Sequence, residues 1–247
     1  QKLMMMFGFF VKLELSDNGK YKVTFNYCEP TLTEKELNGI SMIILDSLTK
    51  PVKDSVGSEC LCGESIIART IKAIKEKFPQ MFIVTDLCFC EYTDHGHCGI
   101  LDPKTQSVHN DKTLEISALQ ALVHARAGAD MIAPSGMMDG IIMTLRNALD
   151  ENGFKNLPIM AYSTKFASGY YGPFRDVAES TPSFGDRRTY QMNPANSKEA
   201  LIEAELDESE GADFLMVKPA LAYLGIIHLL KQNTNLPIAA YNVSGED

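Results

Sequence analysis

The segment "NSKEALIEAELDESEGADFLMVK", residues 196–218, carries the pattern that decides the fold. Apolar residues recur at helical spacing in its first part, Gly211 follows the last of them, and a short apolar run comes next. A helix followed by a buried strand is the unit of a parallel sheet covered by helices. Similar apolar runs recur from Gly39 onward, at residues 41–47, 81–87, 129–135, 157–163, 212–218 and 236–244. This series favours a single α/β domain built as a barrel.

The stretches between these runs are amphipathic. Residues 65–78, 112–128 and 196–211 are predicted to form helices that cover the sheet. In such barrels the active site forms at the carboxyl ends of the strands and in the loops that follow them. The polar residues expected there are Asp46, Asp86, Cys88, Ser135, Ser163, Lys165, Lys218 and Ser244. Any one of them can be an ordinary strand-end residue, but together they indicate a site.

The amino-terminal end has a different pattern, one that predicts a hairpin. "FVKLEL" (residues 10–15) and "YKVTFNY" (21–27) alternate apolar and polar residues around "SDNG" (16–19), which is a type I′ turn signal. We therefore expect a hairpin and connector over residues 1–38, followed by the barrel over residues 39–247.

The composition narrows the class of protein. The chain has 247 residues, is 45% hydrophobic and carries a formal net charge of -9. An acidic chain is a poor match for nucleic acid or for an anionic membrane, because both bind basic surfaces. The six cysteines, without a secretory leader, favour a reducing compartment, and we expect a cytoplasmic protein. The apolar opening "QKLMMMFGFFVKLEL" is too short to span a bilayer.

Two lysines follow consecutive predicted strands. Lys165 lies just beyond "IMAYST", and Lys218 ends "FLMVK". Neighbouring strands lie about 4.8 Å apart, so the two side chains can reach one cavity. Two ammonium groups in a partly dry pocket depress each other's pKa, which yields an amine able to attack a carbonyl and form a Schiff base. The alternative is a pair of surface lysines or anion clamps.

The loop after Lys165, residues 165–196, is long and rich in glycine, proline and aromatic residues, as in a lid or binding segment. It contains Arg175 and Arg187. Arginine can grip a carboxylate through two parallel hydrogen bonds, so an acidic small molecule is the expected substrate. The alternative is that the arginines of this loop pair only with Asp176 and Asp186 beside them.

The loop after the strand at 81–87 contains a cysteine cluster. Cys88, Cys90 and Cys98 form C-x-C-x7-C, and three thiolates suit zinc. Three protein ligands leave a position open for water or substrate, as in a catalytic site. A closed structural site remains an alternative, with His95 or His97 as the fourth ligand. A disulfide scaffold is the weakest of the three interpretations.

Several stretches together resemble the porphobilinogen synthase family, also called 5-aminolevulinate dehydratase. They are "TDLCFCEYTDHGHCGIL", "NDKTLE", "AGADMIAPSGMMDG", "YSTKFASGYYGPFRD", "FGDRRTYQMNPAN", "EGADFLMVKPALAYL" and "NVSGE". They span about residues 54 to 246 in the family's order. The resemblance implies a (β/α)8 TIM barrel that condenses two 5-aminolevulinate molecules into porphobilinogen with loss of two waters, in haem and other tetrapyrrole synthesis.

The resemblance also implies roles for individual residues. Lys218 would form the Schiff base with one substrate, and Lys165 would hold or covalently engage the other. The implied substrate-binding residues are Arg175, Arg187, Gln191, Ser244, Asp86 and Ser135. Cys88, Cys90 and Cys98 match the zinc-dependent branch, and Glu203 matches a position associated with allosteric magnesium. The family typically forms a homo-octamer.

The chain also departs from the family's pattern. Gly136 and Ile141 stand where the family usually has an acid and an arginine. The amino-terminal hairpin differs from the family's oligomerising arm, and we expect the barrel to be incomplete, without its eighth βα unit. The alternative function is therefore a catalytically impaired relic that keeps the zinc site and the fold and acts only as an assembly partner. A generic Schiff-base aldolase would leave the cysteines unexplained.

Overall fold

The computed structural model describes residues 4–7, 9–15, 21–26, 42–47, 52–172 and 181–243. Before residue 52 the description is of the backbone, apart from the side chain of Met42.

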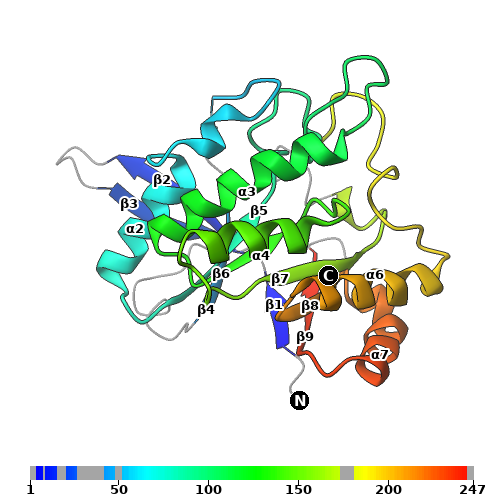
Figure 1. Cartoon of the computed structure of the whole chain (residues 1–247). Coiled ribbons are helices and arrows are strands. Elements are labelled where there is room, and N and C mark those ends of the chain that lie inside the picture. The colour runs from blue at the N-terminus through cyan, green and yellow to red at the C-terminus, as the bar shows by residue number, and fades with distance from the viewer. Residues whose placement is uncertain are drawn as a thin grey trace.

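The predicted α/β class with parallel strands is confirmed (Figure 1). Each of the apolar runs contains a strand: β4 (Met42–Ser47), β5 (Phe82–Leu87), β6 (Met131–Pro134), β7 (Met160–Lys165), β8 (Phe214–Lys218) and β9 (Ile238–Asn242). The strands β4, β5 and β6 pair in parallel, as do β7, β8 and β9. A parallel bridge between Ile132 and Ile159 joins the two groups.

The amino-terminal strands pair more widely than a local hairpin. Strand β2 (Phe9–Leu15) pairs antiparallel with β3 (Tyr21–Asn26), as predicted, and the turn signal at 16–19 lies outside the described residues. Strand β2 also pairs in parallel with β4, and β1 (Met4–Phe7) pairs in parallel with β9. These pairings satisfy backbone groups at the outer edges of β4 and β9. The domain boundary at residue 38 remains a prediction.

Helices cover the sheet: α2 (Ile66–Lys77), α3 (Asn110–Ala127), α4 (Ile141–Glu151), α6 (Ser197–Glu210) and α7 (Leu224–Asn233). Three of them, α2, α3 and α6, lie where the sequence predicts helices. The Ser65 hydroxyl caps α2 by accepting a hydrogen bond from the Ala68 N–H, while Gly128 and Gly211 end α3 and α6 in the left-handed conformation that favours glycine. None of the helices in the described part of the chain has the length and apolarity needed to cross a membrane.

Side chains inside the strands form a second core, separate from the packing between helices and sheet. Its members include Val84, Met131, Ala133, Met160, Tyr162, Met216, Ala239 and Tyr241. Because alternate residues of a strand face opposite sides, the strands bury apolar residues on both faces, as in a filled barrel. This inner core leads to the carboxyl ends of β7 and β8, where the two lysines lie.

Candidate active site

Lys165 and Lys218 end neighbouring strands and lie opposite each other in the register of β7 and β8. Both are buried, with 5% and 4% of their surface exposed. The Lys165 Nζ donates a hydrogen bond of 2.7 Å to the Ser135 carbonyl oxygen. The structure therefore brings the two predicted lysines together below the surface, which excludes a pair of surface lysines.

Tyrosine rings surround the two ammonium groups. The Lys218 Nζ lies 3.7 Å from the ring centroid of Tyr241, and both lysine nitrogens lie 5.4 Å from that of Tyr162. An aromatic face attracts a cation, so the tyrosines hold the lysine heads in the cavity. These tyrosines are not among the site residues predicted from the sequence. A signal exists in the sequence, because "LPIMAY" (157–162) and "LPIAAY" (236–241) repeat one motif on two strands.

Asp86 and Ser135 lie beside Lys165, at the ends of β5 and β6. The Ser135 hydroxyl donates a hydrogen bond of 3.1 Å to Oδ2 of Asp86, while the Ser135 carbonyl accepts from Lys165. The three residues form one hydrogen-bonded chain across three strands. The resemblance implies that Asp86 and Ser135 line the substrate cavity. The hydrogen bonds from Ser135 to Asp86 and from Lys165 to Ser135 connect both residues to the lysine site.

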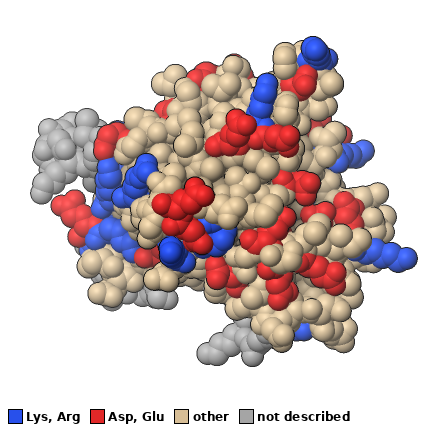
Figure 2. Space-filling view, viewed as in Figure 1, with Lys and Arg blue, Asp and Glu red and all other residues tan. Residues whose placement is uncertain are grey.

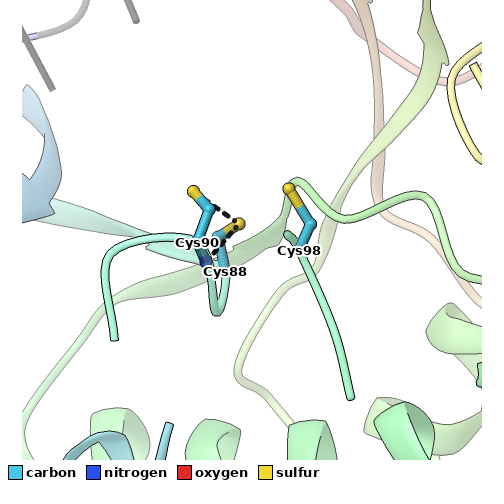
Figure 3. Close-up of side chains that lie close together, drawn as sticks. All are labelled: Cys88, Cys90 and Cys98. Carbon is cyan, nitrogen blue, oxygen red and sulfur yellow. Dashed lines mark hydrogen bonds between the residues drawn. The ribbon is translucent and has the colours of Figure 1, made fainter. Parts of the chain in front are cut away.

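Cys88, Cys90 and Cys98 form a buried triad, and their sulfur atoms lie within 4.8 Å of one another. The sulfur atoms of Cys88 and Cys90 are 3.2 Å apart, and all three thiols point to the same side of the loop (Figure 3). The five cysteines that the structure describes are free thiols, so the disulfide interpretation gains no support. Three converging thiols are a donor set that suits zinc.

Hydrogen bonds and neighbouring charges shift the pKa values of two thiols of the triad in opposite directions. Hydrogen bonds from Cys88 and Cys90 hold the pKa of the Cys98 thiol well below its usual range, and the charges of Arg187 and Lys165 act in the same direction. The hydrogen-bonding contacts of Cys90 with Cys88 and Cys98, together with burial, raise the pKa of the Cys90 thiol. The charges of Arg187 and Lys165 thus favour the ionised form of the Cys98 thiol.

His95 and His97 use both ring nitrogens for other contacts. The His95 Nε2–H donates to the Ser55 carbonyl oxygen at 3.3 Å, and its Nδ1 accepts from the His97 backbone N–H at 3.1 Å. The His97 Nε2–H donates to the Phe184 carbonyl oxygen at 3.0 Å, so its Nδ1 accepts from the Tyr190 hydroxyl at 3.1 Å. These contacts disfavour either histidine as a fourth metal ligand and favour a site with an open position.

Arg187 and Gln191 lie in one turn of the predicted binding loop, and both are buried. The Arg187 Nη2 donates to the Gly96 carbonyl oxygen at 3.0 Å, and the Arg187 carbonyl oxygen accepts from the Gln191 N–H at 2.8 Å. In the described structure, Oε1 of Gln191 has no hydrogen-bond partner. A buried acceptor without a partner indicates that a donor, such as a ligand or water, belongs beside it.

Arg188 pairs with a neighbouring aspartate, which is the alternative role for the arginines of this loop. It is exposed, and its Nε lies 3.6 Å from Oδ2 of Asp186. Arg175, Asp176 and Ser244 lie outside the described residues, so their predicted roles stay predictions.

Comparison with known proteins decides the family. The family model described as delta-aminolevulinic acid dehydratase matches residues 14–247. The chain belongs to this family. The match begins well before residue 54, where the recognisable motifs start, and so includes part of the amino-terminal hairpin.

Individual members of the delta-aminolevulinic acid dehydratase family agree. The Helicobacter pylori dehydratase is 54% identical over 240 residues, which are 96% of this chain and 72% of that protein. The Synechococcus elongatus dehydratase is 58% identical over 211 residues, 84% of this chain and 64% of that protein. The Toxoplasma gondii dehydratase, solved with its reaction product porphobilinogen, is 42% identical with a TM-score of 0.83, over 86% of this chain and 62% of that chain. The chain thus spans about two thirds of these relatives.

Glu203, for which the resemblance implies a magnesium role, lies on α6. Burial and the nearby carboxylates Asp139, Glu199 and Glu210 raise its pKa. Acidic side chains gather over this side of the molecule, whereas lysines and arginines are more frequent near α2 (Figure 2). Among the described residues, the cysteine triad is the one group of three converging ligand atoms, so Glu203 belongs to no preformed site there. Its magnesium role remains a prediction.

Gly136 and Ile141, which the sequence marks as departures from the resemblance, both lie near Cys98. They line a small cavity together with Cys98. A Cβ atom at Gly136 would lie 3.3 Å from the Cys98 carbonyl oxygen, so the glycine lets this strand end approach closely. Ile141 is the first residue of α4 and is buried in the core.

Proposed function

We propose that this member of the delta-aminolevulinic acid dehydratase family condenses two 5-aminolevulinate molecules into porphobilinogen with loss of two waters. The observation that carries the proposal is the buried pair Lys165 and Lys218, in register on neighbouring strands beside a triad of buried thiols. The reaction needs a nucleophilic amine and a metal. It therefore accounts both for the lysines that end two strands and for the cysteine cluster. An aldolase without a metal would leave the triad without a role.

Lys218 is proposed as the covalent residue. Its neutral amine attacks the keto carbon of 5-aminolevulinate, and the adduct takes up one proton and loses water to leave a protonated imine, which withdraws electrons and acidifies the adjacent C–H. Lys165 holds the second substrate, and the tyrosine rings exclude water around both nitrogens.

Arg187 and Gln191 are proposed to bind the carboxylate of the substrate held at Lys165, together with Arg175. Arg187 is buried and directs one nitrogen to Gly96. The amide nitrogen of Gln191 is proposed as a further donor to the same anion. Ser244 is proposed to hold the substrate at Lys218, while Asp86 and Ser135 line the cavity.

Zinc is proposed as the metal, held by Cys88, Cys90 and Cys98. When bound with an open position, zinc can polarise a substrate oxygen as a Lewis acid. We also propose a cytoplasmic homo-octamer with an allosteric magnesium at Glu203. These last proposals are supported by the resemblance to the family and by the free thiols.

The proposed Schiff base is tested by trapping. Borohydride added to the zinc-loaded chain with 5-aminolevulinate reduces the imine to a stable amine, and peptide mass spectrometry should find the adduct on Lys218. An adduct found only on peptides without Lys218 would sink the mechanism. A zinc-loaded chain that forms no porphobilinogen would instead favour the assembly-partner alternative.

A conservative change at Arg187 should separate binding from chemistry. Arg187→Lys keeps the positive charge but removes the planar pair of donors, so we expect KM for 5-aminolevulinate to rise about tenfold with a much smaller change in kcat. Steady-state kinetics measures both constants. Arg188→Lys, at an exposed site in the same loop, is the matched control and should leave KM unchanged. Equal effects of the two variants would contradict the role of Arg187.

A further inference from the structure

Two loops meet beside the cysteine triad. The cysteine loop, residues 88–98, carries the three thiols, and the arginine loop, residues 181–192, carries Arg187 and Gln191. Residues 183–186 of the arginine loop are exposed, so little apolar packing fixes that part of its backbone. The contacts with the cysteine loop therefore decide where the arginine loop lies.

Tyr190 connects the two loops at their centre. Its hydroxyl oxygen accepts the Cys98 backbone N–H at 3.4 Å and lies 3.1 Å from Nδ1 of His97, to which it donates. The Tyr190 side chain also packs against the cluster of Cys88, Cys90 and Cys98. One side chain of the arginine loop thus contacts the cysteine loop both at the Cys98 backbone and at the cluster of thiols.

Further hydrogen bonds join the loops on either side of Tyr190. The His95 carbonyl oxygen accepts from the Ser183 backbone N–H at 3.0 Å and from its hydroxyl at 3.2 Å. The Gly96 carbonyl oxygen accepts from Arg187 at 3.0 Å. His97 reaches Phe184 with its Nε2, and their ring centroids are 5.0 Å apart.

Gly96 allows this close approach. Its φ is +71°, and a Cβ atom there would lie 2.8 Å from the Thr181 carbonyl oxygen, closer than side-chain carbons come to other atoms. A residue with a side chain would strain the backbone and push the arginine loop away.

The other end of the arginine loop is attached to the lysine site. The Met192 backbone N–H donates to the Lys165 carbonyl oxygen at 3.0 Å, and the Ala167 N–H donates to the Met192 carbonyl oxygen at 2.9 Å. Tyr190 therefore lies on a short backbone path between Cys98 and Lys165, with Gln191 directly after it.

We propose that Tyr190 is a positioning residue that couples the cysteine loop to the arginine loop, so that a metal on the triad orders Arg187 and Gln191 for the carboxylate. The proposal rests on the proposed function and adds a regulatory link between its two binding sites. A metal bound to Cys98 would hold the Cys98 backbone N–H in place. The Tyr190 hydroxyl accepts this N–H, so the arginine loop would become ordered as well. Because such coupling is reciprocal, carboxylate binding by the arginine loop also tightens metal binding.

The coupling is measured by amide hydrogen exchange of the full chain with and without zinc, read by mass spectrometry. In the unsubstituted protein, zinc should slow exchange in residues 181–192 about tenfold. In Tyr190→Phe this effect should fall below about twofold, while zinc still slows exchange in residues 88–98. The variant should also raise KM for 5-aminolevulinate more than it lowers kcat, since Tyr190 acts through Arg187 and Gln191.

Two further variants separate coupling from general damage. Tyr170→Phe removes a hydroxyl from a tyrosine that is 45% exposed, and it should keep the full zinc response. Gly96→Ala parts the loops from the other side and should reproduce the Tyr190→Phe result. An arginine loop that responds to zinc equally in Tyr190→Phe, or that ignores zinc in the unsubstituted protein, would overturn the inference.

The outcomes also separate this inference from the proposed function. A chain that forms porphobilinogen but whose arginine loop ignores zinc contradicts the coupling alone. A chain without turnover whose arginine loop responds to zinc through Tyr190 supports the coupling and contradicts the proposed reaction.

Discussion

Replacing Lys218 with alanine should lower kcat/KM for porphobilinogen formation by at least about a thousandfold, equivalent to about 4 kcal/mol of transition-state stabilisation. The imine cannot form without the amine, so borohydride should no longer trap substrate at the end of β8. The measurements are a porphobilinogen assay and mass spectrometry of the reduced protein.

Two variants show whether the loss is chemical. Lys218→Arg keeps the charge beside Tyr241 but offers no neutral amine at ordinary pH, so it should be as inactive as the alanine variant. Lys155→Ala removes a lysine from an exposed turn and should retain full activity. If Lys218→Arg kept most of the activity, the charge rather than the covalent bond would be the contribution of this residue.

Removing the metal, or one thiol that holds it, should have the second largest effect. Chelation of the purified chain should lower kcat/KM by about a hundredfold, or about 3 kcal/mol, and added zinc should restore it. Cys90→Ser should lose the activity and fail to regain it at the same zinc concentration. The free energy of unfolding should rise as zinc fills the site. Zinc at one hundred times its Kd raises the free energy of unfolding by about 2.7 kcal/mol.

The chain offers a matched control for the thiol change. Cys62 is exposed and lies outside the triad, so Cys62→Ser should bind zinc like the unsubstituted protein. Cobalt in place of zinc gives thiolate-to-metal absorption, which reports binding without turnover. Activity that survives complete metal removal would contradict the proposed role of the triad. Loss of cobalt binding in Cys62→Ser would show that the metal site includes Cys62 and is not the triad alone.

The sequence predicted the strands and several helices well, because each depends on a local pattern. An apolar run of a few residues is buried wherever the sheet forms, and Gly211 ends α6 through its own backbone freedom. The lysines were predicted for the same reason, since a polar residue that closes an apolar strand lies at the end of that strand. The cysteine triad also follows from spacing, because Cys88 and Cys90 are close in the chain and the loop returns Cys98.

The pairing of β1 with β9 was not predicted, since it joins residues at opposite ends of the chain. No local pattern records which edge of a sheet a strand will meet. The tyrosines over the lysines were missed for a related reason: Tyr162 and Tyr241 belong to different strands, and their common target appears only when the barrel brings those strands together.

By itself, then, the sequence determined the class of fold, the strand ends and the kinds of chemical group that each strand end carries. The tertiary structure alone decided which groups meet: Lys165 with Ser135, Lys218 with Tyr241, and Tyr190 with the backbone of Cys98. The physical reason is range. Backbone preference and side-chain burial act over a few neighbouring residues, whereas a hydrogen bond or a cation over a ring forms only after packing has closed a long loop of chain.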